Sequence, residues 1–518
     1  MKNKHIKLGD NRVKEIIEVQ SLFSHENNTI QIVQRRLIHF LVQMGYGVYS
    51  KTSKFLNGEL IKKQNQTIKE VNEHELRRDV LECLSKSDLE ECYLEKFQKS
   101  ISTVLSKTQI FTVRDMDLPI LKDTANEGYF AFNNKIVKVS KDKIDFIEYK
   151  DLEMYIFEKQ KKNFSIATEG EGNGDFKQFC KLVTNNNDEW FLSLQTTIGY
   201  LLLSNKDAIE EKAVITYDHN LGNENQANGG SGKSLIFHLA ISQLKNVTII
   251  DGKRYDPRST RFMYQNVEAT TNVILVDDVN DKFNFSQIYS AVTNGFDIEK
   301  KGKQAIHLEI KEAPKFVITS NRLLKVDEGS SARRRMHEMF IFNHFNADHR
   351  PIDEFGKGFF APHWDELEFN KFYYFMFECV QLYLKHGLKE YIPTDLKKIK
   401  LRYEIGENWN NFFDEYLDMS LDDEGKVNRK EFEEIVLEEF PLFTPHTLTK
   451  KLKIYCQYND LDFSIENSGG VQTFKIVASE NEQPSIEKVQ TIEQKESNVM
   501  KMLISQLNDY KGKGSSNE

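Results

Sequence analysis

A glycine-rich run that ends in Gly-Lys-Ser is the part of this chain with the clearest chemistry. Glycine lets backbone N–H groups approach a phosphate chain closely, and the N-terminus of a following helix adds partial positive charge. Lys233 would reach the β- and γ-phosphates, and the Ser234 hydroxyl would ligate Mg²⁺. The residues expected to hold a nucleotide are Asn228, Gly229, Gly230, Ser231, Gly232, Lys233, Ser234 and Leu235.

The run departs from the usual phosphate-loop pattern at one position. The pattern G-x-x-x-x-G-K-[ST] has glycine where this chain has Ala227. A polar insert at 218–226 separates the run from the strand expected to lead into it, at 213–217. A flexible surface loop with an incidental lysine is the alternative interpretation, and the motifs further along the chain weigh against it.

A second motif is an apolar strand that ends in two carboxylates. The run 272–276 (NVILV) is typical of a buried strand in a parallel sheet, and Asp277 and Asp278 follow it. Open α/β sheets bind ligands at the carboxyl ends of their strands. Asp277 would hold Mg²⁺ directly or through water, and Asp278 would orient or deprotonate the attacking water. The alternative is an ordinary acidic turn.

A third strand, KFVITS at 315–320, ends at Asn321. An Asn or Thr side chain here can hydrogen-bond the nucleophilic water and sense the γ-phosphate. Alone the motif is weak, because Ser-Asn after a strand is common in turns. It becomes stronger evidence for a nucleotide site because it follows the glycine-rich run and the acidic strand end in the chain.

A run of three arginines follows at 333–335, with no acidic neighbour in the run. Such a cluster needs an anion, and the nucleotide of an adjacent subunit would supply one, which is the arginine-finger role in trans. Arg334 or Arg335 is the expected finger, and the sequence does not choose between them. A solvated basic turn or a nucleic-acid contact is the alternative.

The motifs NGGSGKS, VILVDD, KFVITSN and SARRR stand in the order found in superfamily 3 helicases, and residues 205–345 resemble the helicase part of phage and poxvirus primase-helicases. The resemblance implies an AAA+-related ATPase that uses ATP and Mg²⁺, forms a homo-hexameric ring on DNA and binds ATP between subunits. Two features depart from the family pattern: Ala227, and an Asp-Asp pair where many relatives carry Asp-Glu or Glu-Glu. Both bear on the hydrolysis rate more than on nucleotide binding.

The resemblance also implies a basic hairpin that faces the ring channel. The matching stretch is 297–306, in which Lys300, Lys301 and Lys303 flank a glycine as a hairpin tip would place them. A ring of such tips would grip DNA phosphates without reading bases. A solvated turn is an equally good interpretation of any single lysine.

Composition restricts where and how such a protein would act. The formal net charge is -9, which excludes a strongly basic protein that coats nucleic acid. The five cysteines show no metal-ligand spacing and predict reduced thiols. The N-terminus lacks the apolar segment of a secretory signal, and no apolar stretch is long enough for a membrane span. We therefore expect a cytoplasmic protein, in a bacterial or host cytosol, without a membrane partner.

The expected fold class is α/β: a P-loop AAA+-like parallel sheet flanked by helices, with an α+β N-terminal region and a C-terminal winged-helix-like module. In that module a basic second helix at 448–458 would contact DNA, although a protein-contact role is nearly as plausible. The predicted parts are an accessory α+β region at 1–165, a helical collar or linker at 166–210, the ATPase core at 211–345, a helical lid or bundle at 346–400, the winged-helix-like module at 401–479 and a mostly disordered tail at 480–518.

The leading hypothesis is an ATP-dependent, ring-forming DNA helicase that acts on single-stranded or forked DNA in the replication of a phage or mobile element. Asp115 and Asp117 resemble the metal-binding pair of a primase but lack a third carboxylate in matching context, so a primase would be a separate partner. The alternative is a non-unwinding NTPase switch, such as a replication initiator, a loader or a defence ATPase.

Overall fold

The computed structural model divides the chain into two compact units, Met1–Pro393 and Thr394–Glu518, which are described separately. Three predicted site residues, Asn228, Gly229 and Lys303, lie outside the described residues, as does the tail at 480–518. The structure describes residues 19–26, 29–49, 59–110, 112–113, 115–206, 210–219, 230–256, 260, 262–280, 282–301, 305–324, 334–362, 364–468 and 470–478.

The first part of the larger unit combines short antiparallel strands with helices around one apolar core, including the short helix α4 (Lys107–Ile110). The apolar spacing of residues 30–44 predicts a helix over that whole range. The observed helix is shorter, because Thr29–Ile32 forms β2, paired with β1 (Phe23–Glu26). The longer helices are α1 (Gln34–Gln43), α2 (Glu73–Ser85) and α3 (Glu91–Val104), and the remaining strands are β3 (Tyr46–Tyr49), β4 (Glu59–Gln64) and β5 (Thr67–Glu70).

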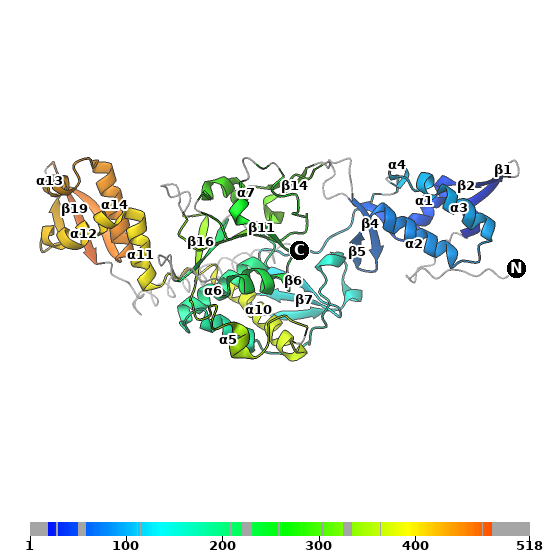
Figure 1. The fold of residues 1–518 in the computed structure, drawn as a ribbon, viewed down its shortest axis with the longest axis horizontal. Coiled ribbons are helices and arrows are strands. Elements are labelled where there is room, and N and C mark those ends of the chain that lie inside the picture. The colour runs from blue at the N-terminus through cyan, green and yellow to red at the C-terminus, as the bar shows by residue number, and fades with distance from the viewer. Residues whose placement is uncertain are drawn as a thin grey trace, which may run out of the picture. The chain divides into compact units, whose positions relative to one another are not determined.

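An antiparallel meander follows; the alternating apolar residues at 136–139 and 144–147 are typical of such strands. Its strands β6 (Glu127–Ala131), β7 (Ile136–Ser140) and β8 (Ile144–Ile147) pair in sequence order. The long helix α10 (Glu366–His386) packs on β7 and on α6 (Asp188–Leu202), so segments far apart in the sequence lie side by side (Figure 1). Aromatic pairs such as Phe132 with Tyr373 join the meander to α10.

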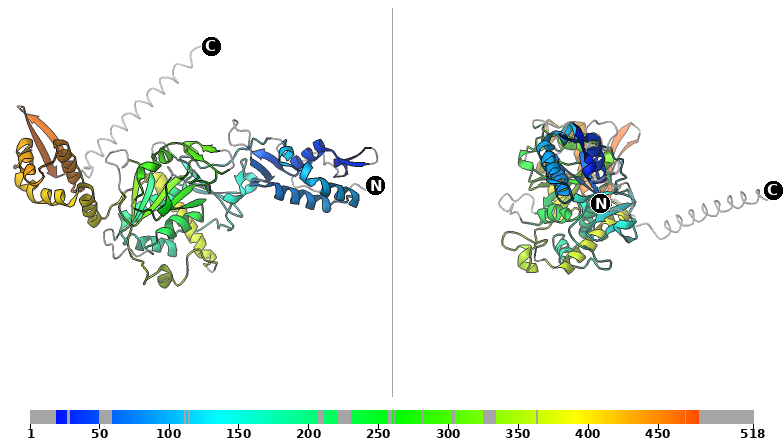
Figure 2. Two further views of the ribbon diagram at one scale, coloured as in Figure 1. Left: turned by 45° about the horizontal axis from the view of Figure 1, so that its top comes forward. Right: turned by 90° about the vertical axis from the view of Figure 1, so that its right-hand side faces the viewer.

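The centre of the larger unit is a five-stranded parallel sheet, whose strands run side by side in Figure 2. Every neighbouring pair is parallel, in the order β11-β12-β15-β10-β16. Because the carboxyl ends of parallel strands share one edge, this topology creates a single edge for ligands. The strands are β10 (Ala213–Asp218), β11 (Val247–Asp251), β12 (Val273–Asp277), β15 (Lys315–Ser320) and β16 (Met336–Ile341).

Helices cover this sheet, and the strand sequences reflect that burial. All residues of β10 and β15 are buried, which explains why they form continuous apolar runs instead of alternating ones. The helix α6 packs on β16, where the Trp190 indole donates a 2.8 Å hydrogen bond to the Phe340 carbonyl. Nearly all of α6 is buried, as in a core helix. The larger unit is therefore a mixed α/β structure built on a parallel sheet.

A buried lysine ties this sheet to the end of α6. Lys315 begins β15 and is 2% exposed, and its ammonium donates to the carbonyls of Tyr200 at 2.6 Å and Leu203 at 2.7 Å. It also lies 3.9 Å from the centre of the Tyr200 ring. A cation at this place satisfies carbonyls that the last turn of a helix leaves without partners.

Replacing Lys315 with methionine is expected to change how stability depends on pH. Burial lowers the pKa of Lys315 to about 7, whereas a lysine in the unfolded chain titrates at about 10.4. Between these values the unfolded chain holds more protons, so the wild-type free energy of unfolding rises with pH through this window. Relative to Lys315→Met, the wild type should gain about 2 kcal/mol between pH 7 and 9 in denaturant unfolding. Parallel pH profiles would contradict the assignment.

The smaller unit has its own apolar core, formed by four helices and a three-stranded antiparallel sheet of order β17-β19-β18. The basic side of α14 (Pro445–Tyr458) makes a contact within the unit, because the Lys451 ammonium donates to the carbonyl of Ile405 at the end of α11 (Thr394–Ile405). The elements are α11 (Thr394–Ile405), α12 (Glu407–Ser420), β17 (Lys426–Asn428), α13 (Arg429–Glu439), α14 (Pro445–Tyr458), β18 (Leu461–Ser468) and β19 (Val471–Ala478).

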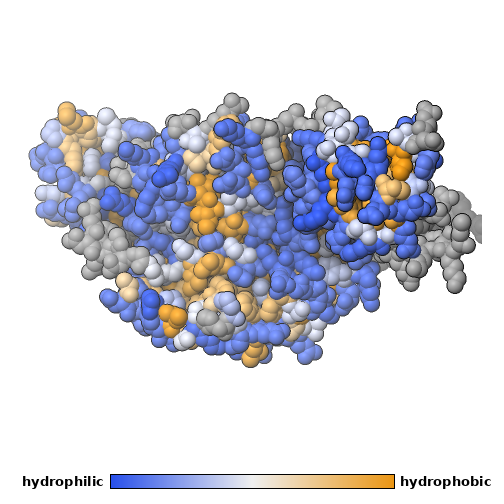
Figure 3. Space-filling model, turned by 45° about the vertical axis from the view of Figure 1, so that its right-hand side comes forward, coloured by the Kyte–Doolittle hydropathy of each residue, from blue (hydrophilic) through white to orange (hydrophobic). Residues whose placement is uncertain are grey.

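The face drawn in Figure 3 is mostly hydrophilic, with apolar atoms gathered in several separate areas. Among the described helices, none is both long enough and apolar enough to cross a bilayer.

Candidate functional site

Four of the predicted site residues, Lys233, Asp277, Asp278 and Asn321, lie at the carboxyl edge of the parallel sheet. Lys233 lies where the loop after β10 enters a helix, Asp277 and Asp278 lie at the end of β12, and Asn321 follows β15. Because β15 lies between β10 and β12 in the sheet, these three strand ends are neighbours. Topology thus brings together side chains that are far apart in the sequence.

The glycine-rich loop has the backbone conformation that its composition predicted. Gly230 and Gly232 adopt φ values of 110° and 107°, a region that side chains with a Cβ rarely occupy. A Cβ at Gly232 would also lie 2.7 Å from Cζ of Phe179 on α5 (Asp175–Leu182). The chain then enters a helix that includes a π-helical turn at Leu235–Ala240. Such turns are rare and are often found at functional sites.

The Lys233 ammonium is held between two strands. It donates to Asp218 Oδ2 at 2.6 Å and to Asn321 Oδ1 at 2.9 Å. The side chains of Lys233 and Asp218 are only 13% and 10% exposed, so this ion pair is largely shielded from water. Asp218 also accepts a hydrogen bond from the Ser231 hydroxyl. The loop and the end of β10 are therefore joined by a charged hydrogen-bonded cluster.

Asp218 is a site residue that the sequence alone did not identify. We placed it at the start of a polar insert, whereas the structure makes it the last residue of β10 and buries it. Its position at the end of an apolar run is the signal that would have identified it, because Asp277 likewise ends β12 and Asn321 directly follows β15.

The two carboxylates at the end of β12 contact the tip of β15. Asp277 Oδ1 accepts a 2.7 Å hydrogen bond from the Thr319 hydroxyl, and that hydroxyl oxygen accepts a 2.7 Å bond from the Asp278 backbone N–H. Asp278 adopts a left-handed conformation with φ 55°, which turns the chain at the strand end. Its carboxylate accepts a 3.2 Å hydrogen bond from the Asn321 amide nitrogen.

Asn321 therefore bridges the phosphate loop and the acidic pair, since its oxygen faces Lys233 and its nitrogen faces Asp278. On the other side, Asp278 Oδ2 lies 2.8 Å from the Lys253 ammonium, and this carboxylate raises the pKa of Lys253. Lys253 is a second residue that sequence reasoning did not assign to the site. An amide that contacts both groups is well placed to respond to a ligand between them.

The chemistry available at this edge is binding of an anion together with a divalent cation. The residues in the cluster carry three carboxylates, from Asp218, Asp277 and Asp278, and two ammonium groups, from Lys233 and Lys253. Carboxylate and hydroxyl oxygens are the ligands that Mg²⁺ prefers. Asp277 and the exposed hydroxyl of Ser234, at the start of the helix, are the groups that would hold it. Backbone N–H groups of the loop would face the anion.

The arginines lie elsewhere in the same chain. Arg335 directly precedes β16, and its carbonyl accepts a 2.8 Å hydrogen bond from the backbone N–H of Ala213, the first residue of β10. Arg334 and Arg335 are therefore at the amino edge of the sheet, whereas Lys233 follows the carboxyl edge. A six-residue strand separates the two edges by roughly 20 Å. Arg334 is exposed, and Arg335 is half-buried with its guanidinium 5.2 Å from the Tyr289 ring.

The stretch expected to form the basic hairpin contains two paired strands, and residues 302–304 between them lie outside the described residues. Strands β13 (Phe296–Ile298) and β14 (Ile306–Leu308) pair antiparallel in the larger unit. Lys300 is half-buried and Lys301 is exposed at the end that joins the strands. An Asp297–His307 ion pair of 2.6 Å crosses the strands.

One protein family and several solved structures are similar to parts of this chain. A family described as a family of unknown function (DUF5906) matches residues 226–335, which is less than half of the chain. No match was found among curated proteins. The A form apo structure of the NrS-1 C-terminal region is similar at 12% identity with a TM-score of 0.38, covering 85% of this chain and 99% of that one. A structure of Drosophila ORC bound to AT-rich DNA and Cdc6 is similar at 9% identity with a TM-score of 0.16, covering 62% and 95%.

Proposed function

We propose that this protein is an ATP-dependent DNA helicase of the superfamily 3 type, with an AAA+-like ATPase core and a ring-shaped assembly. The observation that carries the proposal is the Asn321 bridge, with its oxygen 2.9 Å from Lys233 and its nitrogen 3.2 Å from Asp278. It joins a phosphate loop and an acidic strand end at one edge of a parallel sheet. That combination suits hydrolysis of a Mg²⁺-bound triphosphate.

Each residue of the cluster then has a distinct role. Lys233 and the loop N–H groups bind the β- and γ-phosphates, while Ser234 and Asp277 hold Mg²⁺. Asp278 orients the attacking water, and Asn321 senses whether the γ-phosphate is present. Before nucleotide binds, Asp218 holds the Lys233 ammonium at 2.6 Å. A triphosphate would therefore enter a site in which the lysine is already positioned but must leave a carboxylate partner.

The position of the arginines supports an assembly in which subunits complete one another's sites. Arg334 is exposed and lies at the opposite edge of the sheet from Lys233 of its own chain. A neighbouring subunit whose amino edge faced this carboxyl edge would supply the guanidinium. Repetition of such a head-to-tail contact closes a ring when the rotation between subunits allows it.

We assign the coupling between ATP hydrolysis and DNA binding to the hairpin formed by β13 and β14. We expect Lys300→Ala/Lys301→Ala to leave basal ATP hydrolysis within about twofold of wild type and to reduce DNA stimulation and strand displacement at least about tenfold, because non-specific binding depends on phosphate contacts. Hydrolysis with and without single-stranded DNA, together with unwinding of a forked duplex, measures the effect. Lys311→Ala removes a charge from another surface turn and is the matched control.

Full stimulation and unwinding by the hairpin variant would overturn the assignment of the hairpin. Wild-type hydrolysis that is indifferent to DNA, with no strand displacement, would instead support the second candidate, a non-unwinding NTPase switch. One observation favours that candidate. Lys451, on the basic helix of the smaller unit, donates to the Ile405 carbonyl of that unit, which leaves fewer cations for DNA phosphates.

A further inference from the structure

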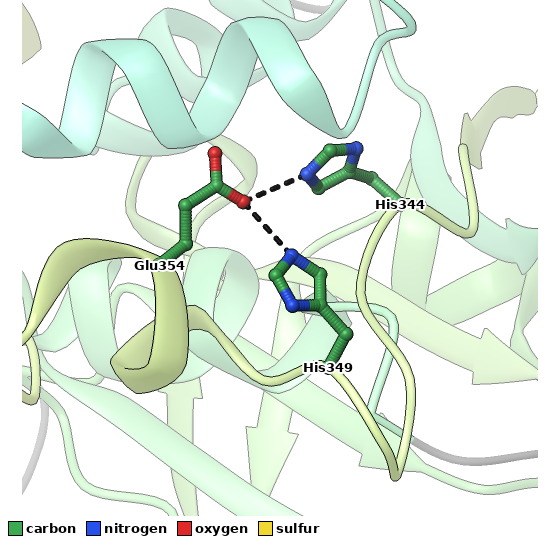
Figure 4. A group of neighbouring side chains, drawn as sticks. All are labelled: His344, His349 and Glu354. Atoms are coloured by element: carbon green, nitrogen blue, oxygen red, sulfur yellow. Dashed lines mark hydrogen bonds and ion pairs between the residues drawn. The ribbon is translucent and has the colours of Figure 1, made fainter.

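Two histidines and a glutamate form a compact cluster that the proposed reaction does not use. His344 and His349 lie on the segment that follows β16, and Glu354 lies on the short helix α9 (Pro351–Phe355). The two imidazoles point toward the same carboxylate (Figure 4). Nε2 of His344 and Nε2 of His349 lie 2.8 and 3.0 Å from Oε2 of Glu354.

The rings are held in place by packing. His349 stacks on Phe345 with ring centres 5.6 Å apart, and His344 meets the same ring edge-on at 4.6 Å. Phe345 is fully buried and stacks in turn on Phe179 of α5. Pro351 at the start of α9 and the bonds between Arg350 and Asp353 fix the helix that carries Glu354. The three donors are therefore positioned in advance, which lowers the entropy lost when an ion binds.

We propose that His344, His349 and Glu354 bind one transition-metal ion, with Zn²⁺ the best match. One ligand atom from each residue lies within 4.8 Å of the others. Zinc takes imidazole nitrogen and carboxylate oxygen at about 2.0–2.2 Å, so tetrahedral donors are about 3.3 Å apart. The distances from Nε2 of His344 and of His349 to Oε2 of Glu354 would therefore have to increase by only a few tenths of an ångström. Water would supply the fourth ligand, and the mixed nitrogen–oxygen set disfavours Mg²⁺.

The charge of Glu354 and the exposure of the three side chains also favour binding of a metal ion. Hydrogen bonds from His344 and His349 hold the pKa of Glu354 below its usual range, so it is a carboxylate at neutral pH. His344 and Glu354 are half-buried and His349 is exposed, which leaves a path for an ion to enter. In the absence of metal the histidines would donate to Glu354, and an ion would replace both hydrogen bonds.

The turn that carries the two histidines lies next to the described end of the phosphate loop. The side-chain oxygen of Asn346 accepts hydrogen bonds from the backbone N–H groups of Asp348 and His349, which closes the turn between the two histidines. A Cβ at Gly230 would be 3.5 Å from the carbonyl carbon of Asn346, so this turn lies against the loop. An ion that joins the turn to α9 would restrict the surface on which the loop rests. This consequence depends on the proposed nucleotide site, whereas metal binding does not.

Metal binding is tested on the full chain without nucleotide. Wild-type protein treated with chelator, desalted and titrated with Zn²⁺ should bind one tightly held equivalent, and Co²⁺ should give the visible absorption of a four-coordinate site. Glu354→Gln and His344→Gln should weaken Zn²⁺ binding at least about 100-fold, since even loss of an outer-sphere partner costs 10–100-fold. His307→Gln is the matched control, because His307 pairs with the Asp297 carboxylate and, among the described residues, belongs to no group of three possible metal ligands.

Equal Zn²⁺ binding by wild type and Glu354→Gln, or no tight equivalent in the wild type, would overturn the site and leave only a hydrogen-bonded cluster. The effect of zinc on the phosphate loop is tested separately, by measuring nucleotide affinity. Zinc-loaded protein, desalted and assayed in Mg²⁺, should bind a fluorescent ATP analogue about fivefold or more tightly than zinc-free protein. Tight zinc binding with unchanged nucleotide affinity would remove the link but keep the metal site, and failure of all nucleotide binding would count against the proposed function alone.

Discussion

Lys233→Ala is expected to lower the rate of ATP hydrolysis at least about 100-fold, as removal of one donor to a developing anion does in other active sites. The reason is geometric: Lys233 is the only cation in the described part of the phosphate loop, and Asp218 and Asn321 aim its ammonium along the carboxyl edge of the sheet. Steady-state hydrolysis at saturating MgATP measures the effect. Nucleotide affinity measured by fluorescence titration should fall as well.

This variant also leaves the buried Asp218 carboxylate without its cation, which destabilises a fold by its own mechanism. The double variant Lys233→Met/Asp218→Asn removes both charges and should unfold at a temperature close to wild type, yet remain inactive. Lys282→Ala, an exposed lysine outside the cluster, is the matched single control and should retain activity. Hydrolysis at wild-type rates by the folded double variant would refute the phosphate-binding role of Lys233.

Arg334→Ala is expected to abolish hydrolysis by the assembled protein, by about 10³-fold or more, if its guanidinium completes the site of a neighbouring subunit. Within one chain the arginine cannot reach Lys233, because it precedes the start of β16 whereas Lys233 follows the end of β10. Nucleotide binding should be much less affected than turnover, since the charge that the arginine stabilises develops in the transition state.

Complementation separates action between subunits from a loss of folding. Lys233→Ala supplies an intact arginine and Arg334→Ala supplies an intact pocket. Subunits of the two variants mixed in equal amounts before assembly should recover about a quarter of wild-type activity, because a quarter of head-to-tail interfaces contain both intact parts. Arg335→Ala removes the same charge one residue along, where the guanidinium packs over Tyr289, and should mainly lower stability. Mixtures no more active than their components would exclude the arginine finger.

Local sequence was enough to predict most strands of the sheet and the shape of the phosphate loop. The apolar run of β15 coincides with the observed strand, because a strand buried on both faces carries mostly apolar residues. The mostly apolar residues at 247–250 likewise predict a strand and coincide with β11, although this edge strand is only partly buried. Gly230 and Gly232 were predictable because their positive φ values exclude most other residues. The early helix was predicted too long, since apolar spacing over a few residues does not separate a helix from a strand such as β2.

The sequence by itself determined which chemistry this chain can offer, because residue types and strand ends carry that information locally. Only the tertiary structure decided which groups meet. Strand order places Asn321 between Lys233 and Asp278. It also pairs the buried Asp218 with Lys233 and puts Arg334 at the opposite edge of the sheet. The tertiary structure also places His344 and His349 within reach of Glu354. Such contacts depend on the order and direction of distant segments in the fold, which no local pattern of residues encodes.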